Sequence, residues 1–171
     1  MKNLILALFM SLSLVLSAQK AKNFKLKYTL PAGWSAEEFG GKSPWEDEGN
    51  ALCHCSGIHF FKMHKDGKMN VVVYPSTQAG LDSAKRNFVG PLYFEDVTKK
   101  ENVRSNERSF ERKKSTFTDS KSKRESFGVF RYFTKVDDHY YIIYAWQENP
   151  QPLNSTDEKD LLEMVRNIEV N

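Results

Sequence analysis

Two adjacent segments constrain the fold of this chain most. In each of them, aromatic and aliphatic residues occupy both sets of alternating positions. Residues 125–136 and 140–147 alternate in the manner of β-strands, and neither alternating set is purely polar. Asp137 and Asp138 between them are typical turn residues. Strands with apolar residues on both faces are typical of the centre of a sheet that is covered on both sides. We therefore predict a central antiparallel hairpin with a further layer on each face.

Shorter patterns indicate more strands and one loop. Residues 24–30 alternate as a half-buried strand, and residues 107–118 are typical of a polar strand. The apolar runs 58–63 and 69–74 flank an Asp-Gly pair, which is a strong signal for a β-hairpin. Residues 36–57 show no periodicity and are expected to form a long loop.

Two helices are expected, one in the middle of the chain and one near its end. Residues 77–89 carry apolar side chains at helical spacing behind a candidate N-cap, Ser76 or Thr77. Residues 155–167 open with a Ser-x-x-Glu capping box and continue with an apolar stripe. The predicted fold class is α+β, an antiparallel β-sheet flanked by helices, in a single domain over residues 22–171.

Composition and charge exclude several classes of protein. Hydrophobic residues make up 40% of the chain, and the formal net charge is only +3. This balance argues against a disordered chain and against a dedicated nucleic-acid-binding protein, which would carry a larger basic excess. Two cysteines are too few for a disulfide-dense scaffold or for a four-cysteine zinc site.

The first eighteen residues have the pattern of a secretory signal peptide. Lys2 supplies the positive start, residues 4–16 form a mostly apolar run, and Ser17 and Ala18 are small residues before the expected cleavage point. The run is too short for a membrane span, and no second run approaches membrane length. Residues 1–18 are therefore predicted to be removed, which leaves a periplasmic or secreted protein without a transmembrane segment.

The densest group of reactive side chains is Cys53-His54-Cys55, which is followed closely by His59. Thiolate and imidazole are good ligands for zinc and for cuprous copper. Because Cys-x-Cys places both sulfurs on the same side of an extended segment, the pattern suits one metal ion. Cys53, His54, Cys55 and His59 are therefore candidate ligands for zinc or copper.

Other states of the cysteine pair remain open. Exported chains usually oxidise their cysteines, so a local disulfide between Cys53 and Cys55 is favoured over metal binding. Such a bond closes a very small loop and is strained, and strained disulfides are more easily reduced. Free or intermolecular thiols are a further alternative, and a thiol-dependent redox function would use the same two residues.

Charge is unevenly distributed along the chain. Residues 99–124 hold ten basic and four acidic residues, whereas residues 35–57 hold one lysine and five acids. The basic segment suits a phosphate or an anionic glycan. The interpretation that we favour is a polar edge strand whose lysines prevent aggregation.

Four features together carry a family resemblance. They are the Leu-Pro-Ala-Gly-Trp motif at residues 30–34, a hairpin followed by a helix at 77–89, the long hairpin at 125–147, and a closing helix that ends in Asn-Ile-Glu-Val at 167–170. In this order they resemble the PsbP-like domain family over nearly all of the chain that follows the signal segment. The resemblance implies an antiparallel sheet sandwiched between helices.

The resemblance also implies a binding or assembly accessory protein without a common catalytic residue set. The sequence contains no Gly-x-Ser-x-Gly elbow, no His-Glu-x-x-His motif, no phosphate loop and no dinucleotide fingerprint. We therefore expect a non-enzymatic, monomeric protein of the bacterial cell envelope that binds an envelope protein or a small ligand. The cysteine-bearing loop departs from the family pattern, so a metal-binding or thiol-redox protein is the alternative.

Overall fold

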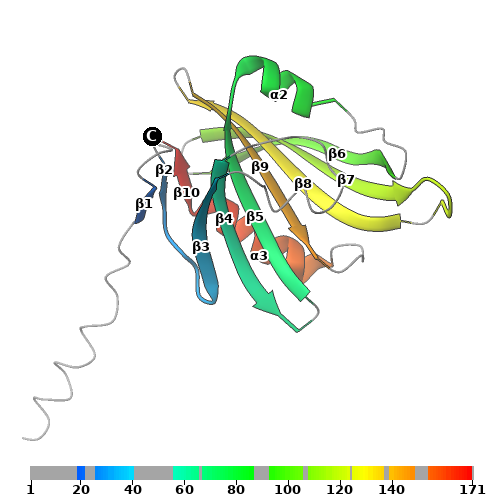
Figure 1. Cartoon of the computed structure of the whole chain (residues 1–171), viewed down its shortest axis with the longest axis horizontal. Coiled ribbons are helices and arrows are strands. Elements are labelled where there is room, and N and C mark those ends of the chain that lie inside the picture. Colours follow the sequence, from blue (N-terminus) through cyan, green and yellow to red (C-terminus); the bar gives the residue numbers. More distant parts are fainter. Residues whose placement is uncertain are drawn as a thin grey trace, which may run out of the picture.

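A computed structural model of the chain (Figure 1) describes residues 19–21, 26–40, 56–65, 67–86, 93–105, 108–123, 125–136, 139–148 and 154–170. Elements within these ranges are labelled as in the figure. The fold is α+β, an antiparallel sheet with a helix on each face, as the sequence predicts.

The main sheet in the described part of the chain has seven strands, and each pairs with antiparallel neighbours. Its order is β3-β4-β5-β9-β8-β7-β6, so β3 and β6 are the two edges. The strands are β3 (Trp34–Gly40), β4 (Ser56–His64), β5 (Gly67–Ser76), β6 (Tyr93–Ser105), β7 (Arg108–Asp119), β8 (Glu125–Val136) and β9 (His139–Gln147).

The hairpin of β8 and β9 lies inside the sheet and is covered on both faces, which confirms the prediction. Alternate side chains of each strand belong to two separate buried clusters, one on each face of the sheet. One cluster packs against the C-terminal helix, and the other packs against the helix that follows β5. On β9 the first set is Tyr141, Ile143 and Ala145, and the second is Ile142, Tyr144 and Trp146.

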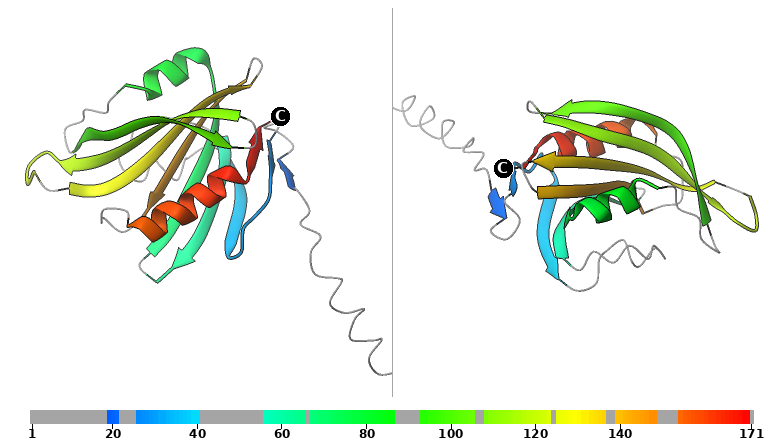
Figure 2. Two further views of the ribbon diagram at one scale, coloured as in Figure 1. Left: turned by 180° about the vertical axis from the view of Figure 1, so that it is seen from behind. Right: turned by 90° about the horizontal axis from the view of Figure 1, so that it is seen from above.

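The two helices lie on opposite sides of the sheet, as the view from above in Figure 2 shows. Helix α3 (Ser155–Arg166) buries Leu161 and Met164 against β5 and β9. Helix α2 (Gln78–Ala84) buries Leu81 against the other face, beside β9. The faces of the sheet are therefore called the α3-side and the α2-side below.

A second, three-stranded sheet lies beside the main one. Strand β2 (Leu26–Tyr28) is its middle strand and pairs antiparallel with β1 (Gln19–Ala21) and β10 (Ile168–Val170). The strand predicted at residues 24–30 therefore belongs to this small sheet. Leu26 is buried in the core under α3, which ties the small sheet to the rest of the fold.

Both edge strands of the main sheet correct the sequence analysis. Residues 36–40 were expected in a loop, but they belong to β3 and pair with β4. Residues 93–105 were also expected outside the strands, but they form β6 and pair with β7. Edge strands with few apolar residues show no clear alternation, because only part of one face is buried.

The turn between β4 and β5 also differs from the prediction. His64 pairs with Gly67, so Gly67 is part of β5 and the Asp-Gly pair does not by itself form the turn. Gly67 has a φ of +129°, a conformation that glycine adopts without strain. This register keeps Lys65 from lying opposite another lysine.

The helix caps are of the expected kind. The Thr77 hydroxyl accepts a hydrogen bond from the Gly80 amide at 3.1 Å, which confirms Thr77 as the cap of α2. In α3 the cap is Asn154, whose side chain accepts from the Asp157 amide at 3.0 Å. The cap therefore lies one residue before the Ser-x-x-Glu box that the sequence suggests.

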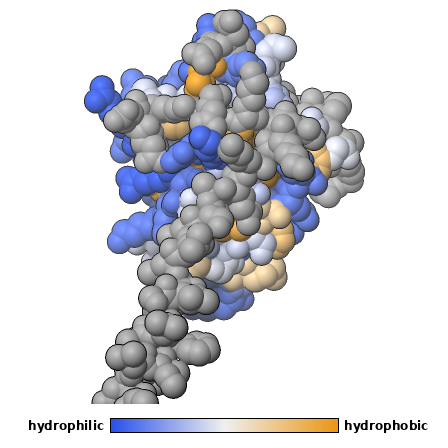
Figure 3. Space-filling view, turned by 90° about the vertical axis from the view of Figure 1, so that its left-hand side faces the viewer, coloured by the Kyte–Doolittle hydropathy of each residue, from blue (hydrophilic) through white to orange (hydrophobic). Residues whose placement is uncertain are grey.

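Residues 1–18 lie outside the described residues, so the signal peptide stays a prediction, as does the single domain over residues 22–171. None of the helices in the described ranges is long and apolar enough to cross a membrane. Figure 3 views the molecule from the left-hand side of Figure 1, where the coloured surface is mainly hydrophilic and its apolar spots are small.

Gly57 marks a close approach of β4 to its neighbours. A Cβ atom at Gly57 would lie 2.8 Å from the Phe39 ring and closer still to the Val73 carbonyl oxygen. Because that oxygen belongs to the backbone of β5, we expect Gly57→Ala to lower the free energy of unfolding by about 1–3 kcal/mol.

Gly40→Ala is the matched control, since no atom of the described residues lies within 4 Å of a Cβ built at Gly40. It is expected to change the free energy of unfolding by less than about 0.5 kcal/mol. Urea unfolding of both variants measures the difference. Equal effects of the two substitutions would contradict the close approach at Gly57.

Candidate functional site

Strands β6, β7 and β8, called the arm here, carry charged networks on both faces. On the α2-side, Lys100 lies opposite Lys113, Lys113 lies opposite Arg131, and Arg131 lies opposite Tyr144 of β9. Three cations therefore stand in one row across the arm. Like charges directly opposite one another are destabilising, so the row requires compensating groups.

Glu95 of β6 is the buried carboxylate of this row. Its Oε1 atom pairs with the Arg131 guanidinium, and the Ser115 hydroxyl donates to the same oxygen. Glu95 is 5% exposed and Arg131 is 2% exposed. The contact joins the edge strand β6 to β7 and β8, and it is shielded from water. Buried ion pairs are costly to break, because the remaining charge stays without compensation.

The same row holds the C-terminal end of α2. Arg131 Nη1 donates to the Ala84 carbonyl oxygen at 2.7 Å, and Lys113 Nζ donates to the Lys85 carbonyl oxygen at 2.7 Å. The last carbonyl groups of a helix lack partners within the helix and carry partial negative charge. Two cations from the sheet therefore cap α2 and fix its position over the arm.

The charges of the row act on one another. Burial and the neighbouring Arg131 guanidinium lower the pKa of Lys113 to about 8, and the Glu95 carboxylate opposes this shift. Burial raises the pKa of Tyr144, and the positive charge of Arg131 opposes that rise. Near pH 8 Lys113 is therefore present in both its charged and its neutral form, whereas Tyr144 is neutral.

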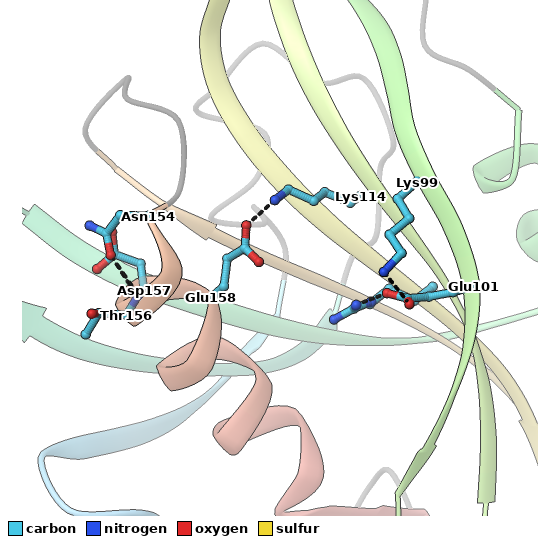
Figure 4. Close-up of polar contacts among 8 residues, drawn as sticks. Lys99, Glu101, Lys114, Asn154, Thr156, Asp157 and Glu158 are labelled. Atoms are coloured by element: carbon cyan, nitrogen blue, oxygen red, sulfur yellow. Dashed lines mark hydrogen bonds and ion pairs between the residues drawn. The ribbon is translucent and has the colours of Figure 1, made fainter.

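The α3-side of the arm holds a second charged network (Figure 4). Glu101 pairs with Lys99, with Nζ and Oε2 2.9 Å apart, and also with Arg112. Lys114 of β7 reaches toward α3 and pairs with Glu158. This network is partly exposed to solvent, since the side chains of Lys114 and Glu158 are 35% and 32% exposed.

Two aromatic rings lie beneath these cations. The Arg112 guanidinium carbon lies 5.1 Å from the centre of the Phe130 ring, and Lys114 Nζ lies 5.6 Å from it, both within cation–π range. Tyr132 lies opposite Arg112 across the strand pair. Burial raises the pKa of Tyr132, and a hydrogen bond with the Arg112 side chain, together with the positive charges of Arg112 and Arg166, offsets part of that rise. The phenol is therefore neutral and can donate a hydrogen bond.

The outer edge of the arm carries exposed cations. Strand β6 ends the sheet, whereas β7, the polar strand that the sequence predicts at residues 107–118, pairs with both β6 and β8 and is not an edge strand. The β6–β7 register also shifts once, and such bulges hinder pairing with further strands. The exposed cations of the edge and of the turn after β7 are Lys99, Lys100, Arg104, Lys121 and Lys123.

Of the four candidate metal ligands, only His59 lies in a described segment. Cys53, His54 and Cys55 lie outside it, so metal binding, a Cys53–Cys55 disulfide and free thiols all stay predictions. Where the structure describes the chain, no three His, Cys, Asp or Glu side chains form a group that could hold a metal ion.

Both ring nitrogens of His59 are engaged in hydrogen-bond contacts on the α2-side of β4. Nδ1 lies 3.0 Å from Glu37 Oε1, and Nε2 lies 2.8 Å from Asn70 Oδ1. The orientation of Asn70 is fixed by its amide nitrogen, which donates to the Lys68 carbonyl oxygen at 3.0 Å. A metal ion at His59 would therefore have to replace one of two existing contacts.

The central members of the α2-side network were not predicted from the sequence. Glu95 fell in a segment that was not expected to be a strand, and Lys113 was counted only within a basic run. The available signal was Arg131, which the alternation of β8 places on an apolar face. A cation in such a position requires a buried partner.

The lowered pKa of Lys113 predicts a pH-dependent stability. The pKa is about 8 in the folded protein and near 10.5 in the unfolded chain, so the folded state binds fewer protons between these values. The free energy of unfolding therefore rises with pH in this window, by up to about 3 kcal/mol from this group. Below pH 8 the contribution of Lys113 is unfavourable and constant.

Lys113→Met removes the titrating group. The difference in free energy of unfolding between the wild type and this variant therefore reports on Lys113 separately from all other titrating groups. Urea unfolding of both proteins from pH 7 to pH 10 measures the effect. We expect the free energy of unfolding of the wild type to increase relative to that of the variant as pH rises. Parallel pH profiles of the two proteins would show that Lys113 has the same pKa in the folded and the unfolded protein, which would contradict the prediction.

No protein-family model matches the sequence, and no curated protein matches it. Among solved structures, the chain is similar to the solution structure of cyanobacterial PsbP (CyanoP) from Synechocystis sp. PCC 6803, with a TM-score of 0.55. The similarity covers 93% of this chain and 95% of that chain, at 11% sequence identity. It shows that this chain has a PsbP-like fold, in agreement with the fold that the sequence resemblance implies.

Proposed function

We propose that this chain is an exported, non-catalytic accessory protein of the bacterial cell envelope, and that it binds an acidic surface of a partner protein through the exposed edge of the arm. The observation that carries the proposal is the gathering of five exposed cations on one edge of the sheet and the adjoining turn. They are Lys99, Lys100, Arg104, Lys121 and Lys123.

Two acids near this edge are engaged within the protein. Glu101 pairs with Arg112 and with Lys99, which is itself one of the five edge cations. Asp119 accepts hydrogen bonds from the Lys121 and Ser122 amides, and these bonds lower its pKa and keep it in the turn. The surplus positive charge therefore faces solvent, where it attracts negatively charged surfaces over roughly a Debye length of 8–10 Å.

The accessory role and the export are supported by two further observations. The first is the signal-peptide pattern at residues 1–18, from which we infer a periplasmic or secreted location. The second is the PsbP-like fold, which the sequence resemblance links to binding and assembly proteins. A metal-binding or thiol-redox function at Cys53 and Cys55 stays the alternative prediction.

The proposal predicts that partner capture depends on the cations of the edge. The mature protein is immobilised, and proteins captured from envelope extract are quantified at increasing salt. We expect the triple variant Lys99→Gln, Lys100→Gln and Arg104→Gln to lose most of the captured protein. Capture by the wild type should fall as salt rises, because exposed charges are screened.

A second triple variant provides the control. Lys65→Gln, Arg86→Gln and Lys159→Gln remove the same charge from exposed positions outside the edge. We expect this variant to capture the partner as the wild type does. Equal losses in the two variants, or no protein captured by the wild type, would contradict the proposal.

A further inference from the structure

The outer side of β6 is an unpaired edge of the described sheet. Strand β6 is the last in the strand order, so β7 alone pairs with it among the described strands. In an antiparallel pair, successive residues direct their N–H and C=O groups to opposite sides, so half of the backbone groups of β6 point away from β7. Such an edge can accept a further strand through the same hydrogen bonds that join the strands of the sheet.

The regular part of this edge runs from Lys99 to Ser105. The register between β6 and β7 shifts between Val97 and Lys99, and a bulge of this kind bends the strand and disturbs the ladder. Beyond the bulge, the pairing with β7 continues without a further shift as far as the pair of Ser105 and Arg108. The extended backbone that an added strand requires is therefore present over residues 99–105.

The side chains of this segment determine what can pair with it. Lys100, Asn102 and Arg104 occupy alternate positions on the α2-side of β6, and all three are exposed. Within the described ranges, neither Lys100 nor Arg104 forms an ion pair with a carboxylate. Val103 lies on the other side and is partly exposed. The edge therefore presents two exposed cations four residues apart, with a neutral amide between them.

These charges oppose pairing with a second copy of the chain. If two β6 edges paired antiparallel about Asn102, Lys100 of each copy would lie opposite Arg104 of the other. Like charges directly opposite one another are destabilising, whereas a carboxylate in the same place forms a cross-strand ion pair. The edge therefore favours an acidic strand over a copy of itself.

From these observations we propose that the edge of β6 from Lys99 to Ser105 binds an extended acidic segment of the partner protein as an additional antiparallel strand. The inference rests on the proposed function, and it states the form in which the acidic partner binds. Acidic residues at the first and fifth positions of the segment lie opposite Arg104 and Lys100. The second position lies opposite Val103, where an apolar side chain adds contact.

Two peptides of equal charge separate strand addition from attraction by charge alone. The first is the capped peptide Thr-Glu-Val-Thr-Thr-Glu-Thr, which carries the two acids at the required spacing. In the second, proline replaces both threonines between valine and the second glutamate. One of these two positions must direct its N–H toward β6, so the second peptide cannot complete the ladder. NMR titration of the isotope-labelled mature protein gives both Kd values.

We expect the first peptide to shift the amide signals of residues 99–105, and the proline peptide to bind about tenfold more weakly, in line with the loss of a backbone hydrogen bond. Equal Kd values would show that only charge is recognised and would overturn the added strand, as would the absence of binding by the first peptide. Under either result, loss of partner capture by the triple variant of Lys99, Lys100 and Arg104 would still support the proposed function. The two proposals can therefore fail separately.

A third peptide tests the faces of the strand with the wild-type protein. Moving the second glutamate to the fourth position keeps the charge but places that carboxylate on the side of the strand away from Lys100. We expect the Kd to rise several-fold. Binding as tight as that of the first peptide would contradict the antiparallel register.

A charge swap completes the test. We expect the variant Lys100→Glu with Arg104→Glu to lose the glutamate peptide and to bind the same peptide with lysine in both glutamate positions. Lys135→Glu with Lys159→Glu makes the same change of charge at exposed positions outside the edge and is expected to leave the Kd for the glutamate peptide within about twofold. An equal loss in this control would indicate a general effect of net charge and would overturn the assignment to the edge.

Discussion

The buried ion pair of Arg131 and Glu95 is the interaction on which the arm of the sheet depends. It ties the edge strand β6 to β8, while a second nitrogen of the same guanidinium holds the last turn of α2. Both partners are shielded from water, so neither can be removed without leaving a buried charge. The position of the edge strand and the position of α2 over the sheet both follow from this arrangement.

The parts of the fold that the sequence predicts are those with local signals. The alternation of residues 125–136 and 140–147 correctly assigns both faces of the central hairpin, because each position depends only on its neighbours along the strand. Strands β3 and β6 were missed, since edge strands bury little apolar surface. Glu95 was missed with β6, although Arg131 on an apolar face indicates that a partner exists.

The features that dominate the sequence differ from those that the structure connects. The Cys-His-Cys motif and His59 form the densest group of reactive side chains in the sequence. Only His59 of these lies in a described segment, where its ring contacts Glu37 and Asn70. The charged networks of the arm are built from residues far apart in sequence, which are brought together by cross-strand register and by the packing of α2 and α3 on the sheet. The PsbP-like fold provides the sheet, but at 11% identity it does not account for these charges.

A double-mutant cycle on Arg131 and Glu95 tests this account most directly. The free energy of unfolding is measured by urea titration for the wild type, Glu95→Gln, Arg131→Met and the double variant. Each single substitution is expected to cost about 3–5 kcal/mol, because it leaves a buried charge without its partner. The double variant should cost less than the sum, with a coupling energy of at least about 2 kcal/mol. Additive costs within about 0.5 kcal/mol would contradict the central place given to this pair.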